Sequence, residues 1–544
     1  MWLMVASATS MAQTIPNAGQ SAQQQLQAPM PAPVSKPLQL PAPPEQTQTT
    51  NPSKESNGVR VNLQAIKLLG NSVFNEQDLL PVLGDVTNQT FDFQDLEGLA
   101  LKIANYYHQQ GYPFASASLP AQDLKDGILQ IEIVEGRYGV ISSSGEFLSE
   151  DAAPFLENLK PGDPIEAKLL ERTMLIIDDL PMISVSPSVR PGQTFGTGNL
   201  DVRITRNTEW DGEVGVDNLG NRFTGEYRTR ATLNGYSKLL FGDMIRMSAI
   251  HTNENMWLGS VDYEAPIYGQ GLRAQAGFAR TTYQLGKDYA YLGASGFANV
   301  YSTKLSYPVV RTQQRNFSIA MGYVEKRLQD RYTSSGAQNN KYSRQIPLTM
   351  LFDARDSFMD GGLTYGNVVL ATGRLNLDES LSATDAQSAQ TQGGFNKITF
   401  ELARMQTLPA DFSLFGRVTK QWANKNLDSS EKFNLGGIYG VRAYPIGEGL
   451  GDRGWLAQFE LRYKFEDLMG FLLIDSGSSS TNSRPWDANS YGTTHLAGQG
   501  VGVRAQQEKG WNWEASVSWR STALPVSDTV NRNPRLWAYA TYKF

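Results

Sequence analysis

The sequence contains no cysteine. This absence excludes disulfides, thiolate zinc sites, iron–sulfur clusters and cysteine nucleophiles. Only three histidines are present, His108, His251 and His495, and they lie far apart, which argues against imidazole catalysis. No apolar run approaches the roughly eighteen residues that a transmembrane helix requires, the longest candidates being short pieces such as Phe471–Ile474. Membrane proteins that cross the bilayer with helices are therefore excluded, whereas a transmembrane β-barrel is still possible.

Charge and hydrophobicity are both low. The 544 residues carry a net charge of −6, with 40% hydrophobic and 19% charged residues, and both fractions are below the averages of globular proteins. Glycine is plentiful, with 50 residues, and so are aromatic residues. Many uncharged polar residues alternate with apolar ones, which favours a protein rich in β-strands. The length indicates about two to four domains.

The amino-terminal segment differs from the rest of the chain. Met1–Ala12 is apolar and carries Ser10 and Ala12 before a cleavage position at Gln13, so it resembles the end of a secretory signal. It lacks basic residues and is short, which favours a truncated signal over a chance likeness. Residues 13–57 are rich in Pro and Gln and predict an extended linker. Composition there favours a disordered tail over a short polar helix at Asn17–Gln27.

Two small α/β modules are predicted next, at residues 58–136 and 137–207. In the first, a strand at Val59–Ile66 precedes helical stretches at Asn75–Leu80 and Phe93–Gln110, and strands follow at Ala115–Leu119 and Ile128–Val134. The second repeats this order, with strands at 138–142, 183–190 and 199–204 and helices at 152–159 and 165–179. Each module is within the usual size of a small domain.

Several sequence motifs in these modules resemble those of a known family. Glu171–Pro181, followed by Pro191–Gly192 and Gly196–Gly198, resembles the second polypeptide-transport-associated (POTRA) domain of two-partner secretion transporters, and Asn105–Tyr112 with Val134–Arg137 resembles the first. The resemblance implies that the modules capture the amino-terminal secretion domain of a partner protein in the periplasm. An open sheet edge is suited to this, because it can bind an extended peptide as an added strand.

Residues 208–544 predict a transmembrane antiparallel β-barrel of about sixteen strands, if each strand and its connection take about 20 residues. Tyr227–Leu233 places Arg228, Arg230 and Thr232 on one face and apolar residues on the other, although a soluble sandwich gives similar alternation. The last strand places Tyr542 and Phe544 on one face with Leu536, Ala538 and Ala540. This pattern resembles the signal that the barrel assembly machinery of Gram-negative bacteria reads.

One motif points to a mechanism. Phe433–Pro445 resembles the Val-Arg-Gly-Tyr motif at the tip of the sixth extracellular loop of two-partner secretion transporters, with Ala443 in place of the usual glycine among Val441, Arg442, Ala443, Tyr444 and Pro445. The resemblance implies that this loop folds back into the lumen and that its arginine pairs with an aspartate on the inner wall. Leu473–Gly477 matches the partner motif, so Asp475 is the expected partner of Arg442. Without these motifs, both residues would be interpreted as ordinary loop charges.

Two other patterns do not predict a site. Gly449–Gly454 matches G-x-G-x-x-G but leads into the alternating strand Trp455–Phe459, without the preceding strand and following helix that nucleotide binding requires. Asp178 and Asp179 are adjacent and fit a helix end better than a catalytic pair. No basic patch with interleaved aromatics indicates nucleic acid.

The sequence therefore predicts α+β periplasmic modules followed by a barrel in the bacterial outer membrane. The expected function is export of a large exoprotein, an adhesin, a haemolysin or a contact-dependent inhibition toxin, in two-partner (type V) secretion. The alternative is a barrel-insertion factor of the same superfamily; a passive porin or a soluble enzyme fits less well. We expect no enzyme activity, cofactor or metal. The expected partners are the exoprotein, the barrel assembly machinery and outer-membrane lipid.

Overall fold

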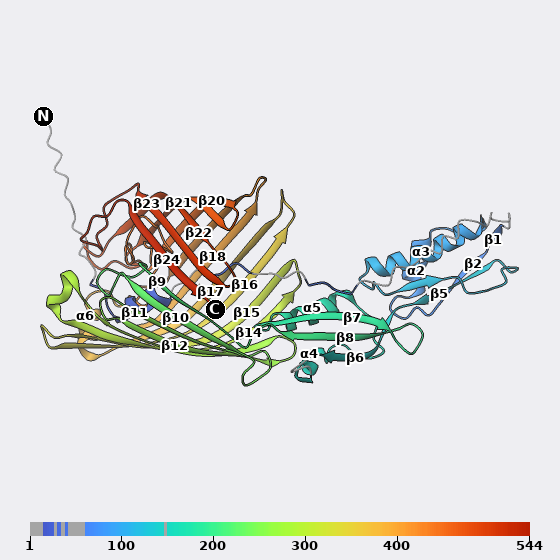
Figure 1. Cartoon of the computed structure of the whole chain (residues 1–544), viewed down its shortest axis with the longest axis horizontal. Helices are drawn as coiled ribbons and strands as arrows, with labels where there is room; N and C mark the ends of the chain where they lie inside the picture. The colour runs from blue at the N-terminus through green and yellow to red at the C-terminus, as the bar shows by residue number, and fades with distance from the viewer. Residues whose placement is uncertain (1–14, 27–29, 34–37, 42–59, 146–149) are drawn as a thin grey trace, which may run out of the picture. The chain divides into compact units, whose positions relative to one another are not determined.

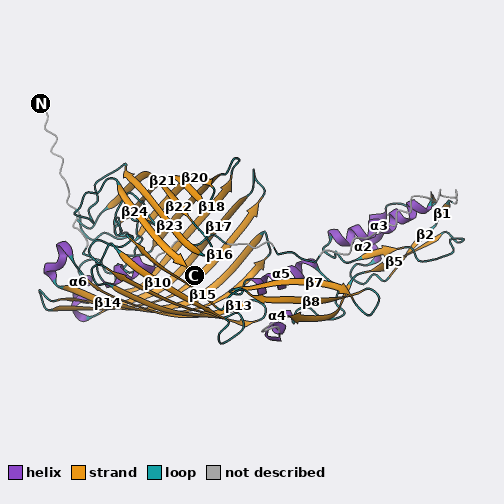
Figure 2. Cartoon of the chain, in the orientation of Figure 1, coloured by secondary structure: helices purple, strands orange, loops and turns teal. Residues whose placement is uncertain are grey.

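A computed structural model of the chain describes residues 15–26, 30–33, 38–41, 60–145 and 150–544. The chain forms two compact units, one with Met1–Ser35, Thr208–Ile267 and Leu272–Phe544, the other with Lys36–Asn207 and Tyr268–Gly271. The predicted signal at residues 1–12 and most of the predicted linker lie outside the described residues. Figure 1 labels the elements along the chain, and Figure 2 distinguishes helices from strands.

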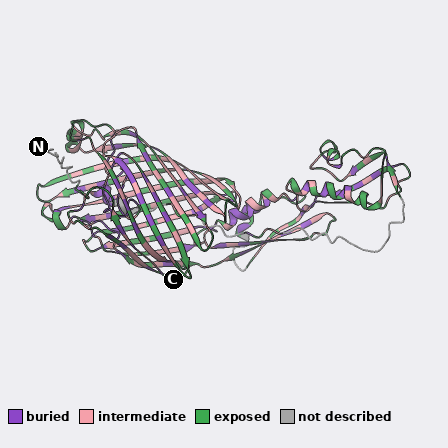
Figure 3. Cartoon of the chain, turned by 90° about the horizontal axis from the view of Figure 1, so that it is seen from above, coloured by how far each residue is buried: buried purple, intermediate pink, exposed green. Residues whose placement is uncertain are grey.

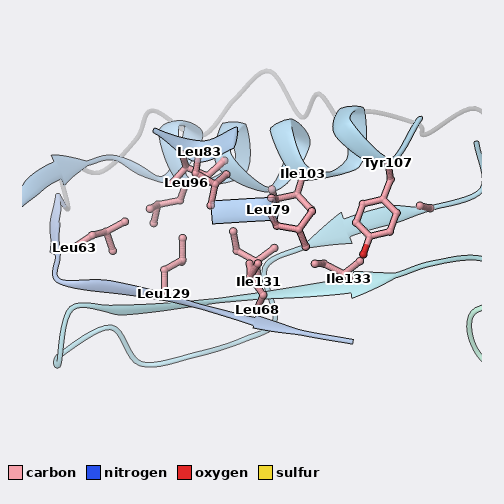
Figure 4. Packing of buried hydrophobic residues seen from close by; sticks show 13 residues of the cluster. Leu63, Leu68, Leu79, Leu83, Leu96, Ile103, Tyr107, Leu129, Ile131 and Ile133 are labelled. Atoms are coloured by element: carbon pink, nitrogen blue, oxygen red, sulfur yellow. The ribbon is translucent and has the colours of Figure 1, made fainter. Parts of the chain in front are cut away.

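The first α/β module packs two helices on a small sheet. In chain order its elements are β1 (Val61–Leu63), β2 (Ala65–Leu69), α2 (Glu76–Leu83), β3 (Gln89–Phe91), α3 (Phe93–Gln109), β4 (Ser116–Ser118) and β5 (Ile128–Val134). The strand order is β2-β5-β4, with β2 parallel to β5. Leucine and isoleucine side chains from the helices and strands meet in one core, and Tyr107 lies at its end (Figure 4).

Both helices of this module begin at capping boxes, in which Asn75 and Asp92 accept hydrogen bonds from the N–H groups of Asp78 and Asp95. The single strand expected at Val59–Ile66 is wrong for the described part of that range. The chain instead forms two strands that separate at Gln64, because β1 pairs with β3 whereas β2 pairs with β5.

The second module has a three-stranded sheet and two helices. Its elements are β6 (Arg137–Ser144), η1 (Glu150–Ala152), α4 (Ala153–Leu156), α5 (Ala167–Asp178), β7 (Ile183–Pro191) and β8 (Thr197–Arg206), with strand order β6-β8-β7. The helix expected at residues 152–159 is shorter than predicted. Its last turn tightens where the Leu159 N–H donates to the Leu156 carbonyl, shortly before Pro161.

A buried carboxylate joins the two modules. Glu135 accepts hydrogen bonds from the Ser72 N–H at 2.5 Å, the Val73 N–H at 2.7 Å and the Arg137 guanidinium at 2.6 Å. Arg137 also donates to the Gly162 carbonyl in the second module. Burial acts to raise the pKa of Glu135, but the hydrogen bonds from Ser72, Val73 and Arg137 outweigh it and hold the pKa below its ordinary value of 4.5.

This lowered pKa predicts acid sensitivity at the junction. The unfolded state takes up the proton first, so the stability that the Glu135 carboxylate contributes is present above pH 4.5 and is lost as the pH falls through the folded-state pKa. We expect Glu135→Gln to destabilise the modules by about 1.5–3 kcal/mol at neutral pH and to flatten the decline below pH 4.5. Hydrogen exchange of β5 amides in the full-length protein measures both effects. Glu132→Gln, at an exposed position of the same strand, should change neither.

Residues 210–543 form a closed antiparallel barrel of sixteen strands. The strands are β9 (Trp210–Asp217), β10 (Arg228–Tyr236), β11 (Met244–Thr252), β12 (Trp257–Tyr268), β13 (Leu272–Gln284), β14 (Ala294–Arg311), β15 (Arg315–Tyr332), β16 (Ala337–Asp356), β17 (Gly362–Leu377), β18 (Gly393–Thr407), β19 (Phe412–Ala423), β20 (Arg453–Phe465), β21 (Leu468–Ser480), β22 (Thr493–Ala505), β23 (Gly510–Arg520) and β24 (Arg535–Lys543). The barrel closes where β24 pairs with β9, from Tyr539 opposite Asp217 to Lys543 opposite Glu213. The alternation of apolar and polar residues also predicts strands at Lys397–Leu408, Phe412–Trp422 and Trp455–Phe465, and these lie within or almost within β18, β19 and β20.

The two faces of the wall differ as a membrane barrel requires (Figure 3). On β24 and at the residue that follows it, Leu536, Tyr542 and Phe544 point outward and are 55%, 41% and 53% exposed, whereas the intervening Trp537 and Thr541 are buried. Phe544 also exchanges two backbone hydrogen bonds with Gly212 of β9. A Cβ atom at position 212 would lie 2.6 Å from the Phe544 ring, so glycine makes room for the terminal aromatic.

Inside the barrel lies a short helix, α1 (Ala18–Leu26), shown in blue in Figure 1. The preference for a disordered tail at Asn17–Gln27 is therefore wrong. The helix packs against the inner face of β13, β14 and β15, where Ala18 joins a core with Tyr283 and Leu328. Tertiary packing stabilises such a short helix where composition alone would not.

The barrel connections contain two more short helical elements, η2 (Lys287–Leu292) and α6 (Glu379–Ala386). Among the described residues, no helix has both the length and the hydrophobicity needed to cross a membrane.

Candidate functional site

The candidate site is the connection between β19 and β20, residues 424–452, which we call the inner loop. Most of its residues are buried although it is a connection rather than a wall strand. Loops normally run over the surface, because their backbone polar groups need partners. The inner loop finds these partners on the lumen side of the wall: Gln458 donates to the Gly440 carbonyl at 2.7 Å, and Arg417 donates to the Tyr439 carbonyl at 2.7 Å.

Arg442 fastens the tip of this loop to two carboxylates. Its Nε and Nη2 atoms donate to the two carboxylate oxygens of Asp475 on β21, at 2.8 and 2.7 Å. Its Nη1 atom donates to Glu460 on β20 at 2.5 Å. Arg442 is 5% exposed and Asp475 is 1% exposed. The geometry is a bidentate pair extended by a third bond, which lysine could not reproduce.

Glu460 is a site residue that the sequence analysis missed. It accepts hydrogen bonds from Arg462 and Arg504, both at 2.8 Å, in addition to the bond from Arg442. Three guanidinium groups therefore surround one buried carboxylate. The only sequence signal was its place on the lumen face of β20, and the register that places Glu460 opposite Leu473 of β21 is a long-range property.

The remaining motif residues form the apolar part of the loop tip. Val441, Ala443 and Tyr444 belong to one buried cluster with Leu435, Leu456 and Leu496. The Tyr444 hydroxyl donates to the Ala523 carbonyl at 2.8 Å, and Pro445 is buried beside it. Ala443 needs no left-handed backbone angle, and its methyl group faces Gly498 of β22, where an added Cβ would come within 2.5 Å. Glycine on the wall thus accommodates alanine in the loop.

This contact predicts a matched pair of substitutions. Gly498→Ala should overpack the loop tip and cost about 1–3 kcal/mol of docking stability, lowering partner secretion. Ala443→Gly in the same chain should restore most of the loss. Gly470→Ala on β21, where no atom lies within 4 Å of the added Cβ, is the control. Equal secretion by the Gly498 and Gly470 variants would contradict the close contact.

Ion pairs hold the base of the inner loop. Glu431 accepts from Lys326 of β15 at 2.6 Å and from Lys397 of β18 at 2.8 Å. Asp428 pairs with Lys341 of β16 at 2.7 Å. These partners lie on β15, β16 and β18, so the base of the inner loop is attached to a part of the wall other than the strands β20 and β21 that hold its tip.

Helix α1 rests on this base. Asn17 accepts a hydrogen bond from Ser429 at 2.8 Å, and Gln23 donates to the Lys432 carbonyl at 2.5 Å. The Ala18 N–H donates to Asp330 of β15 at 2.7 Å. A Cβ atom on Gly19 would lie 2.8 Å from the Ser430 Cβ atom. The helix and the loop together therefore fill part of the lumen.

Comparison with known families agrees with this arrangement. The model of the haemolysin secretion/activation protein family ShlB/FhaC/HecB matches residues 196–505, more than half of the chain. The chain belongs to this family. A ShlB-type POTRA domain matches residues 61–136. Membership of the ShlB/FhaC/HecB family favours a secretion transporter over a barrel-insertion factor.

Two relatives of this ShlB/FhaC/HecB protein match most of its length. The heme/hemopexin transporter protein HuxB of Haemophilus influenzae is 26% identical over 87% of this chain and 85% of its own. The outer membrane transporter CdiB of Dickeya dadantii is 24% identical over 86% and 85%. The solved structure of CdiB from Escherichia coli has the same fold, with a TM-score of 0.72, 18% identity and coverage of 93% and 94%.

The predicted family, fold and location are thereby confirmed. The protein is an outer-membrane transporter of two-partner secretion that exports a partner exoprotein through its barrel, with its POTRA region in the periplasm.

Proposed function

We propose that the inner loop, fastened by Arg442, controls the path of a large exoprotein, an adhesin, a haemolysin or a contact-dependent inhibition toxin. The observation that carries this proposal is the contact of one buried guanidinium with Asp475 and Glu460. Because the loop and α1 lie inside the barrel, an exported chain needs both to make room. The attachment of Arg442 then sets the position to which the loop returns.

Residues 58–136 and 137–207 act as two POTRA domains in this proposal, ahead of the barrel at 208–544, and capture the secretion domain of the partner. Their similar construction supports this division. In each, a strand near the start pairs in parallel with the last strand, β2 with β5 and β6 with β8.

The carboxy-terminal strand, with Tyr542 and Phe544, serves as the signal for the barrel assembly machinery. The outward direction of both rings supports this role, because a signal must be accessible before the wall closes. Serine at both positions should reduce the amount of folded barrel in the outer membrane.

Coexpression tests the proposal. The full-length transporter is produced in a Gram-negative host together with the large exoprotein from the neighbouring reading frame. We expect the exoprotein in the medium only when the transporter is present. Exoprotein retained in the periplasm in its presence would contradict export. A fall in other outer-membrane barrels after depletion of the transporter would instead support the insertion factor.

A further inference from the structure

An apolar patch lies on the inner wall of the barrel and adjoins the loop tip, because its residue Phe415 lies opposite Glu460, which binds Arg442. It consists of Leu363 and Tyr365 of β17, Ala403 and Met405 of β18 and Phe415 of β19. The lumen of a membrane barrel is generally polar, and neighbouring strands here present Lys326, Lys341 and Glu460 to it. An apolar patch in a wet lumen is costly unless something covers it.

A segment of the amino-terminal tail covers this patch. Met30 and Ala32 pack against it, whereas Pro31 between them is exposed. The segment 30–33 forms neither helix nor strand, and alternate residues face the wall as in an extended chain. The patch thus binds two side chains spaced two residues apart.

Polar groups at the edges of the patch bind the backbone of this segment. Arg355 donates to the Pro33 carbonyl at 3.1 Å, and Glu401 accepts a hydrogen bond from the Met30 backbone. Asn367 lies 3.6 Å from the Met30 sulfur. The Oε1 atom of Glu401 is buried without a hydrogen-bond partner among the described residues, so a further N–H group could be accepted there.

These contacts depend little on the identity of the bound side chains. Proteins bind extended peptides by combining hydrogen bonds to the peptide backbone with pockets for alternate side chains. We propose that the patch is a binding site for extended polypeptide with alternating apolar residues, and that residues 30–33 occupy it until the exported exoprotein replaces them. The identity of the replacing chain rests on the proposed function. Among the described residues, the backbone of segment 30–33 is held at the patch by the hydrogen bonds of Arg355 and Glu401, and exchange requires only these bonds and the packing of Met30 and Ala32 to be replaced.

Peptide labelling of the full-length protein tests this site. The chain has no cysteine, so Ala403→Cys introduces a single thiol into the patch. The probe is a short synthetic peptide that alternates valine and serine and carries one activated cysteine. A peptide of equal composition with its valines grouped together is the control probe. Thr232→Cys, on the face of β10 that carries the buried Arg228, is the control position.

We expect the alternating peptide to label position 403 about tenfold faster than the grouped peptide does, a difference of about 1.4 kcal/mol. Met30→Ser with Ala32→Ser should raise labelling further, because the tail then covers the patch less firmly. Labelling that is equal at positions 403 and 232, insensitive to alternation or unchanged by the tail substitutions would overturn the proposal. Heat-modifiable mobility verifies that each variant has folded.

The exoprotein secretion assay distinguishes failure of the patch proposal from failure of the proposed function. Normal export without peptide labelling would overturn the patch alone. Labelling without export of any partner would overturn the proposed function while leaving the polypeptide site in place.

Discussion

Replacement of Arg442 by alanine is expected to reduce partner secretion by about tenfold or more, while the barrel still inserts. The change leaves the Asp475 carboxylate, 1% exposed, without its guanidinium partner. Removing one member of a buried ion pair typically costs about 3–5 kcal/mol. Undocking of the loop lets water reach Asp475, so the variant should favour the undocked state. Secretion of the exoprotein and protease access to the inner loop measure the two effects.

Three further variants distinguish the role of Arg442 in docking the inner loop from a general loss of stability of the barrel. Asp475→Asn in the Arg442→Ala chain removes the orphaned charge and should restore part of the loop protection. Arg442→Lys should remain defective, since an ammonium group cannot form the parallel bonds. Arg462→Ala removes another partner of Glu460 but touches no loop residue in the described contacts, and should secrete almost normally. Normal secretion by Arg442→Ala would contradict the role of Arg442 in fastening the inner loop.

Replacement of Gly19 by leucine is expected to open the lumen. The helix approaches the inner loop so closely that even a Cβ atom would lie 2.8 Å from Ser430. A penalty of about 1–3 kcal/mol from overpacking shifts the population of displaced helix by about five- to 150-fold. Conductance of single channels in planar bilayers should therefore increase and remain high for longer.

Gly98→Leu is the matched control for this change. Gly98 also lies within a helix, α3, but nothing lies within 4 Å of its added Cβ. Both variants lose a helical glycine, yet only the Gly19 variant affects the lumen. If their conductances are equal, the close contact between α1 and the inner loop does not hold the helix in place.

The site residues differ in how far sequence could predict them. Arg442 and Asp475 stand in motifs whose order along the chain resembles a family, so their pairing was expected. Glu460 stands in Phe459–Tyr463, where alternating charges are ordinary for a lumen-facing strand. Its contact with Arg442 depends on strand register and on the fold of the inner loop. Neither is visible in a local pattern.

Helix α1 shows a different limit. Its residues are small and polar, and a composition of this kind predicts disorder when the segment is considered alone. In the barrel the same small residues are an advantage, because Ala18 and Gly19 permit close approach to the wall and to the inner loop. The interactions that order the helix come from residues more than two hundred positions away, such as Tyr283 and Asp330.

No residue of helix α6 is buried, and the helix lies in the connection between β17 and β18. In an antiparallel barrel this connection is at the same end as the β19–β20 connection. Packing therefore places almost no demand on the amino acids of α6, whereas the inner loop is constrained at nearly every position. We therefore expect α6 to vary in sequence and length among relatives, so antibodies raised against this segment should distinguish strains that share the same export machinery.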